Sequence, residues 1–522
     1  MAKKTAKAKT TKSMEETLWD SANKLRGTVE SSEYKHVVLS LIFLKFASDK
    51  FEARKQELIN QGKEKFVDMD AFYMQVNVFY LPAESRWQHI MQQAKQNDIA
   101  LQIDTALHTA EKHNKALKGA LPDNYFSRLN LDPSKLAALL DTINNIDTIA
   151  DKETDVVGRV YEYFLGRFAA AEGKGGGEFY TPKSIVKLIA EMLEPYQGKI
   201  YDPCCGSGGM FVQSIKFIES HHGNTKDISI YGQEYTAVTY KLAKMNLAIR
   251  SISGNLGEVP ANTFFKDQHP DLKADYIMAN PPFNQSQWRD THELESDPRW
   301  AGFTTPPTGN ANYAWILHML SKLSENGTAG FVLANGSMSS NTSGEGRIRQ
   351  ELIERDYVDC MIALPGQLFY TTQIPVCLWF ITKNKGASTT ATGQEYRNRK
   401  GETLFIDARN MGHMADRTHK ELSNEDIAHI AGTYHNWRAS TGSATQYDDV
   451  AGYCKAASLK DIEKNDYVLT PGRYVGVAEE EDDGVPFEEK MTALTARLKE
   501  QMDEAKALDQ AITENLKWLG YE

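Results

Sequence analysis

The feature that most constrains the fold is the hydrophobic pattern along the middle of the chain. Between residues 154 and 407, short β-branched runs alternate with helical stretches and glycine-rich turns, which is typical of an α/β domain. Most of the runs are far enough apart for a helical crossover, so we expect a mainly parallel sheet. The last two runs are too close for one, so we expect an antiparallel pair at the sheet edge. The predicted strands are Lys199–Tyr201, Ile228–Gln233, Tyr276–Ala279, Gly330–Leu333, Cys360–Leu364 and Val376–Thr382, with helices that include Ser184–Leu193 and Ala237–Ile249.

Helical patterns flank this α/β stretch. From Met14 to residue 150, apolar residues such as Leu18, Ala22 and Leu25 recur at three- and four-residue spacing, which predicts an all-helical domain. Near the other end, apolar residues repeat every seven positions and predict a long helix that docks on a partner or on its own chain: Met491, Leu498, Ala505, Ile512 and Leu519.

These patterns divide the chain into five parts. We predict a basic flexible arm over residues 1–13, the helical domain over 14–150 and the α/β domain over 151–446. A polar connector follows over residues 447–486, and the C-terminal helix over 487–522 is expected to make a subunit contact.

Composition excludes several classes of protein. The 522 residues carry 59 Lys and Arg against 70 Asp and Glu, a formal net charge of −11. Because phosphate neutralisation dominates DNA affinity, a chain with this charge would need help from a partner to hold DNA. The five cysteines include no C-x-x-C pair, so neither a disulfide framework nor a metal site is indicated. No run approaches the roughly 20 apolar residues of a membrane span, and no secretory signal is apparent, so we expect a cytoplasmic protein.

A glycine-rich segment follows the first predicted strand and precedes a helix. Glycines at this point allow the backbone to approach a ligand without obstruction by side chains. The segment lacks the G-K-[ST] triplet of a phosphate-binding loop and the strict G-x-G-x-x-G pattern, and by itself it is equally compatible with a plain tight turn. Its residues of interest are Asp202, Gly206, Ser207, Gly208 and Gly209.

An acidic residue, Glu234, ends the next predicted strand. In a doubly wound sheet this position lies beside the first glycine-rich loop, where a carboxylate can accept both hydroxyls of a ribose. Taken alone, such a residue is more often a neighbour of a helix N-cap than a ligand residue. The combination with the next motif favours a nucleoside site.

The strongest motif is Asn280-Pro281-Pro282-Phe283, directly after the strand Tyr276–Ala279. Two prolines fix the backbone and remove two N–H donors, so the carbonyl groups of this turn remain as acceptors. The Asn280 side chain and the Pro281 backbone could accept the hydrogens of an exocyclic amine, and Phe283 offers a face on which a base could stack. A structural alternative is a proline-stiffened turn with an aromatic plug.

On these motifs the chain resembles the modification (M, HsdM-type) subunits of type I restriction-modification systems, which are S-adenosylmethionine-dependent DNA adenine methyltransferases. The resemblance implies a Rossmann-like class I methyltransferase sheet, in which Asn280–Phe283 holds the target base and Asp202–Gly209 and Glu234 hold the cofactor. It also implies a further cofactor segment before them, made of Glu178, Phe179, Tyr180, Thr181, Pro182 and Lys183. Many relatives carry Asp at the third strand where this chain has Asn262, so Asn262 and Asp267 are both candidates for the contact with the cofactor adenine.

The resemblance implies a mechanism and a set of partners. The amine of an adenine flipped from the duplex would attack the methyl group directly, without a covalent enzyme intermediate or a metal ion. A specificity (S) subunit would choose the DNA sequence, two modification subunits would bind it, and restriction (R) subunits would join them. Residues 284–308, with Trp288, Arg289, Arg299 and Trp300, form either a flap over the target strand or a solvated loop.

Other functions are compatible with parts of this pattern. Protein glutamine methyltransferases use a similar Asn-Pro-Pro loop, but they typically have Tyr at the position of Phe283 and lack the helical front domain. A stand-alone DNA adenine methyltransferase, a non-enzymatic subunit with a decayed site and a dehydrogenase are further alternatives. A decayed site should have lost Asn280 or the glycines, and dehydrogenase chemistry does not explain residues 280–283.

Overall fold

The structure is a computed structural model that describes residues 14–23, 31–146, 160–164, 181–369, 374–390, 393–440, 446–477 and 487–518. The chain divides into two compact units, residues 1–476 and 477–522. The predicted arm, the predicted domain boundary near residue 150 and the cofactor-segment residues Glu178, Phe179 and Tyr180 lie outside the described residues.

The N-terminal region is helical, as predicted. Its apolar residues, among them Val37, Leu41 and Leu107, form one buried cluster. Leu242 and Ile249 of the helix α11 (Ala237–Ile249) belong to the same cluster, so the helical region and the α/β region share a core. The α-helices of this region are α1 (Met14–Asn23), α2 (Ser31–Asn60), α3 (Ala71–Met74), α4 (Trp87–Gln93), α5 (Ile99–His113), α6 (Tyr125–Arg128) and α7 (Pro133–Asn144).

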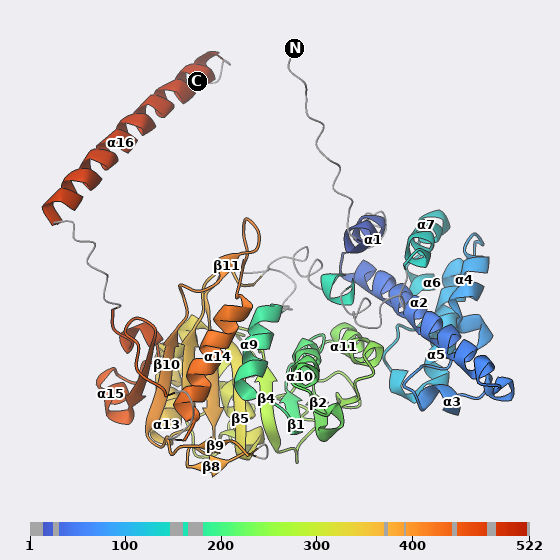
Figure 1. Ribbon diagram of the computed structural model, residues 1–522, viewed down its shortest axis with the longest axis horizontal. Coiled ribbons are helices and arrows are strands. Elements are labelled where there is room, and N and C mark those ends of the chain that lie inside the picture. Colours follow the sequence, from blue (N-terminus) through green and yellow to red (C-terminus); the bar gives the residue numbers. More distant parts are fainter. Residues whose placement is uncertain are drawn as a thin grey trace. The chain divides into compact units, whose positions relative to one another are not determined.

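The middle of the chain folds around a mainly parallel sheet, which confirms the predicted fold class (Figure 1). Within the described residues the sheet has nine strands in the order β13-β10-β6-β7-β5-β4-β1-β2-β3. Strand β7 runs antiparallel to both of its neighbours, β13 runs antiparallel to β10, and the other pairs are parallel. The bounds are β1 (Gly198–Asp202), β2 (Ile228–Gly232), β3 (Gly254–Asn255), β4 (Ala274–Ala279), β5 (Leu323–Ala334), β6 (Val358–Ala363), β7 (Val376–Thr382), β10 (Glu402–Asp407) and β13 (Cys454–Ser458).

Helices cover both faces of this sheet, which explains why β6 and β7 are buried along their whole length and, apart from Asp359 and Thr382, apolar. One face packs against α9 (Lys183–Leu193), α10 (Gly209–Ser220) and α14 (Asn424–Arg438). The other packs against α12 (Asn312–Lys322) and α13 (Glu345–Glu354). None of the helices in the described part of the chain is long and apolar enough to cross a membrane.

The antiparallel pair is placed differently from the prediction. Strands β6 and β7 are antiparallel, as expected, but they lie inside the sheet because β10 and β13 extend it beyond β6. The antiparallel pair at this edge is β10 with β13. The sequence did not indicate β13, whose Cys454, Ala456 and Ala457 are small for a strand of a sheet core.

Part of the predicted connector over residues 447–486 is folded onto the sheet. Strand β13 pairs with β10, and α15 (Leu459–Lys464) follows it. The ring of Tyr474 stacks on Phe405 of β10 with centroids 3.8 Å apart, and the Tyr474 hydroxyl donates to the carbonyl of Val468. This stretch therefore completes the core, and the acidic run 479–483 lies outside the described residues.

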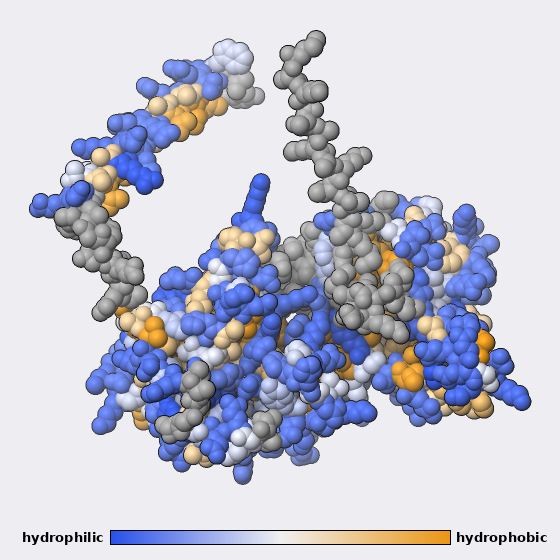
Figure 2. Space-filling model, viewed as in Figure 1, coloured by the Kyte–Doolittle hydropathy of each residue, from blue (hydrophilic) through white to orange (hydrophobic). Residues whose placement is uncertain are grey.

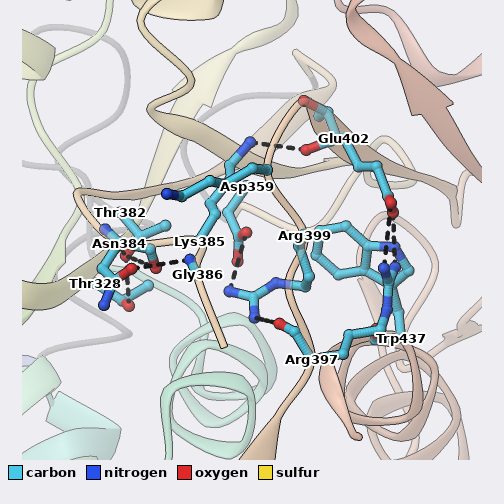
Figure 3. Close-up of polar contacts among 12 residues, drawn as sticks. Thr328, Asp359, Thr382, Asn384, Lys385, Gly386, Arg397, Arg399, Glu402 and Trp437 are labelled. Carbon is cyan, nitrogen blue, oxygen red and sulfur yellow. Dashed lines mark hydrogen bonds and ion pairs between the residues drawn. The ribbon is translucent and has the colours of Figure 1, made fainter. Parts of the chain in front are cut away.

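A cluster of charged side chains, several of them buried, lies where β6 and β10 begin. Figure 3 shows its contacts. Lys385 Nζ lies 2.7 Å from an Asp356 carboxylate oxygen, and Arg399 lies 3.4 Å from Asp359. Arg397 pairs with Glu402 at 2.7 Å. Because Lys385, Arg399 and Asp359 are each at most 3% exposed, the described part of 383–401 is a fixed structural segment, although its polar composition predicts a surface loop.

The second unit contains one long helix, α16 (Phe487–Trp518). Met491, Leu498, Ala505 and Ile512 of the predicted heptad positions lie on it, and Leu519 lies outside the described residues. Figure 2 shows hydrophobic side chains in a band along the helix. Met491, Leu498 and Ile512 are 46%, 57% and 55% exposed. An exposed apolar stripe is the feature that a docking helix requires, and the docking role of this helix stays a prediction.

Candidate active site

The glycine-rich loop connects β1 to α10 at the carboxyl end of the parallel strands. Gly206 and Gly208 have φ angles of +52° and +80°, a conformation that costs other residues about 1–2 kcal/mol. A Cβ atom on Gly206 or Gly209 would meet nothing within 4 Å, so the loop presents bare backbone there. A Cβ atom on Gly208 would instead face Leu247 of α11 at 3.7 Å.

Asp202 fixes the start of this loop. Its side chain accepts the backbone N–H of Cys204 at 3.0 Å, and the residue is 2% exposed. Burial raises the pKa of Asp202 to about 7, despite the opposing hydrogen bonds from Cys204. The carboxyl group therefore titrates near neutral pH.

Glu234 follows β2, the neighbour of β1, and joins the second loop to the first. One carboxylate oxygen accepts the N–H of Gly206 at 3.1 Å and the other accepts the N–H of Thr236 at 2.8 Å. Since a carboxylate has about four lone-pair sites, it can still accept hydroxyl donors. Glu234 thus lies beside the glycine-rich loop, as predicted.

The two candidates for the adenine contact lie in different surroundings. The backbone carbonyl of Glu234 accepts the N–H of Ala261 at 2.8 Å, which brings Asn262 next to the acid. Asp267 forms an ion pair with buried Lys322. Burial raises the pKa of Asp267, but its bonds with Lys322 and the N–H of His269 outweigh that effect and leave it lowered. The carboxylate of Asp267 is thus already bound to Lys322 and to the backbone of its own loop.

Asn280 follows β4, on the other side of β1. Its side-chain Nδ2 donates to Thr181 Oγ1 at 2.9 Å, so the loop before α9 and the loop after β4 meet although they are 99 residues apart. With Nδ2 facing Thr181, the carbonyl arm of the amide points elsewhere, where it can act as an acceptor.

Asn280 and the glycine-rich loop line the same cavity. Predicted residues from three segments contribute to its wall: Thr181, Lys183, Asp202, Gly206, Ser207, Gly209 and Asn280. Pro182 is buried directly before α9. Gly208 lies within the glycine-rich loop. Glu234 is hydrogen-bonded to that loop, and Asn262 follows a residue that is bonded to Glu234. The structure thus brings together the described parts of all the predicted motifs.

The remaining residues of the Asn-Pro-Pro-Phe turn form its support. Pro281 is buried and Pro282 is half-buried. The half-buried ring of Phe283 meets Phe369 edge-on, with centroids 5.7 Å apart.

The predicted flap over residues 284–308 differs from both expectations. Trp288 and Trp300 are buried, and Arg289 donates to the carbonyls of Thr291, Glu293 and Pro306. The side chains expected to face DNA therefore hold the loop together from inside. Those that are exposed on it include the acids Asp290, Glu293 and Glu295.

A charge cluster in the wall of the cavity was missed. Glu162 is 8% exposed and forms ion pairs with Lys183, with Lys216 at 3.2 Å and with Arg250 at 3.2 Å. Burial raises the pKa of Glu162, but the three cations outweigh it and leave it lowered. Asn246, four residues before Arg250, donates to the carbonyl of Ser207 at 2.7 Å. Lys183 belongs to the predicted cofactor segment. The other residues form no motif, so no sequence signal identified them.

The fold and the site define a methyltransferase class, and comparison with known families agrees. The chain belongs to the N-6 DNA methylase family, whose model matches residues 152–483. A model of the HsdM N-terminal domain matches residues 14–143.

Individual relatives narrow this class to the methylase subunits of type I restriction enzymes. The HindI methylase subunit of Haemophilus influenzae is 49% identical over 461 residues, which cover 85% of this chain and 100% of the relative. The MjaIX methylase subunit of Methanocaldococcus jannaschii is 39% identical over 531 residues, which cover 98% and 92%. The resemblance stated from the sequence is thus confirmed.

Solved structures show the same fold. A type I restriction-modification methyltransferase subunit from Streptococcus thermophilus superposes with a TM-score of 0.72 at 22% identity, over 89% of this chain and 99% of that one. Together the comparisons identify the chain as an adenine-specific DNA methyltransferase of the type I class and favour this function over the alternatives.

Proposed function

We propose that this protein, as the modification subunit of a type I restriction-modification complex, transfers a methyl group from S-adenosylmethionine to N6 of an adenine flipped out of DNA. The observation that carries the proposal is the junction of Asn280 with Thr181 in the wall of the cavity that the glycine-rich loop also lines. The contact between Asn280 and Thr181 thus brings the amide carbonyl of Asn280 beside the glycine-rich loop, whose bare backbone is suited to a nucleoside.

The residues fit S-adenosylmethionine. The bare backbone at Gly206 and Gly209 leaves room for it, Glu234 has lone pairs for the ribose hydroxyls, and Asp202 can balance a cation once it is ionised. When bound, the cofactor supplies an electrophilic methyl group on a sulfonium centre. We assign the adenine contact to Asn262, because Asp267 is committed to Lys322.

Asn280 and the Pro281 backbone activate the target. Their carbonyl oxygens accept the two hydrogens of the adenine amine, which concentrates the lone pair on nitrogen and stabilises the charge that develops during attack. Phe283 stacks on the flipped base. Stacking is worth roughly 1–3 kcal/mol, which offsets much of the cost of flipping.

A methyl-transfer assay tests this assignment. The full-length chain, co-expressed with the subunits encoded beside it, should incorporate tritiated methyl groups into DNA. Asn280→Ala should lower kcat by about a hundredfold or more, as for the loss of a preorganised polar group in other enzymes, while S-adenosylmethionine affinity changes little. Thr308→Ala, a change at the last residue of the predicted flap, serves as a control. Wild-type turnover in Asn280→Ala would contradict the role of this residue.

The proposed partners are DNA, a specificity subunit and a restriction subunit, with two modification subunits in each complex. The similarity to type I methylase subunits supports this set. The exposed apolar stripe of α16 offers a contact for the specificity subunit. Deletion of residues 487–522 should abolish co-purification of that subunit, and complex formation by the truncated chain would contradict this part of the proposal.

A further inference from the structure

A short β-hairpin projects from the end of the sheet that carries the site. It consists of β11 (His413–Met414) and β12 (Lys420–Glu421), which pair antiparallel. It follows β10, whose carboxyl end lies at the same sheet edge as those of β6 and β4 because these strands run in one direction. Figure 1 shows the hairpin, labelled β11, extending beyond that edge.

The base of the hairpin is hydrogen-bonded to the segment that carries Phe369, the residue that packs against the Asn-Pro-Pro-Phe turn. The backbone N–H of Lys420 donates to the carbonyl of Gln367 at 2.9 Å. Two residues further on, Phe369 meets the ring of Phe283. Met411 and Leu422, on either side of the hairpin, pack in the same hydrophobic cluster as both rings. The hairpin therefore lies on the side of the site where the target base would enter.

The tip of the hairpin is preorganised. Asp416 accepts the backbone N–H groups of Thr418 and His419 at 2.7 and 2.9 Å, and its second oxygen lies 2.7 Å from His419 Nδ1. These bonds occupy the carboxylate within the turn. Arg417, between these residues, is exposed and has no hydrogen bond or ion pair to any residue that the structure describes.

The charge of this tip differs from that of the predicted flap over residues 284–308, which the sequence suggested as the DNA contact. In the flap, Arg289 is buried and Arg299 is paired with Asp297. Its exposed charged side chains include Asp290, Glu293 and Glu295, which would repel phosphate. In a chain with a net charge of −11, an exposed arginine on a projecting, hydrogen-bonded turn is suited to a DNA backbone.

We propose that the hairpin over residues 411–422 is a DNA-contacting element, in which Arg417 binds a backbone phosphate of the duplex next to the flipped adenine. A two-stranded ribbon has the width that the major groove admits, and arginine is well suited to phosphate. The inference rests on the proposed function, because it requires a DNA substrate at this face.

The test uses the full-length chain in complex with its co-expressed subunits and a duplex that contains the sequence methylated by the wild type. Arg417→Ala should raise the Kd for this duplex about tenfold at low salt, as expected for one charge-assisted hydrogen bond. The slope of log K against log salt should fall by about 0.9. KM for DNA should rise while kcat and S-adenosylmethionine affinity stay unchanged, since the contact is uniform in ground and transition states.

Matched variants separate charge from structure. Arg417→Lys should retain most of the affinity, whereas Lys226→Ala, which removes an exposed cation at the opposite end of the sheet before β2, should change nothing. A photo-crosslinker on Arg417→Cys should label the DNA strand with the target adenine. If the wild type fails to methylate DNA, the proposed function itself is wrong. If the wild type is active but Arg417→Ala binds DNA equally well, or the crosslinker labels only a protein subunit, the hairpin proposal is overturned.

Discussion

The buried carboxyl group of Asp202 should make cofactor binding depend on pH near neutrality. Burial raises its pKa to about 7, and the nearby charge of Glu234 acts in the same direction. A bound sulfonium and ammonium group would favour the ionised form, because opposite charges attract. Binding of S-adenosylmethionine should therefore release a proton from Asp202.

The size of the effect follows from the pKa. With a pKa of about 7, about a tenth of the group is ionised at pH 6 and about nine-tenths at pH 8. If the ionised form alone holds the cofactor, the association constant should rise about ninefold over this range. The stability of the cofactor-free protein should change with pH in the opposite direction to cofactor affinity. Because the folded pKa is raised, the stabilisation of the cofactor-free fold is fully present below about pH 4 and is lost as pH rises through about 7.

Isothermal titration calorimetry between pH 6 and 8, in buffers of different ionisation enthalpy, measures both affinity and proton release. Asp202→Asn, a change of similar shape, should bind with the weaker affinity throughout and lose the ninefold rise. The amine of the cofactor titrates in the same way with both proteins, so its contribution to the pH dependence of binding cancels when the two are compared. Identical pH profiles for wild type and variant would refute the reasoning.

Further predictions concern the loop, the amide and the edge of the sheet. Gly209→Val should weaken S-adenosylmethionine binding at least tenfold, because the new side chain would enter the open space that the cofactor is proposed to occupy. Gly208→Val should mainly lower the melting temperature through backbone strain at φ +80°. Thr181→Val should lower kcat by more than it lowers cofactor affinity, and Thr181→Ser should restore it. Tyr474→Ala should cost about 3–5 kcal/mol in urea unfolding and Tyr474→Phe about 1 kcal/mol; equal losses would contradict the role of the ring stack.

Local chemistry made much of the site predictable. The glycine-rich loop, Glu234 and Asn280 each follow a strand, and the carboxyl ends of parallel strands meet at one edge of a sheet. Strand and helix positions were likewise indicated by hydrophobic spacing, so that Ala237–Ile249 and Val376–Thr382 have the predicted bounds.

Other features depend on contacts that no local pattern encodes. The flap and the segment around Lys385 and Arg399 have the composition of polar surface. Lys385 and Arg399 are nevertheless buried, because each pairs with a carboxylate from another segment. Arg289 is buried because it binds backbone carbonyls across its own loop. Strand β13 joins the sheet although its small residues give a weak strand signal.

The sequence by itself determined the fold class, the order of the motifs and the chemistry each can offer, since these depend on residue type and on the spacing between neighbours along the chain. The tertiary structure alone decided that Thr181 orients Asn280, that Glu162 of the cavity wall pairs with three cations, and that Arg417 is left exposed beside the site. The physical reason is that burial and pairing of a polar side chain depend on which distant segment reaches it when the chain packs.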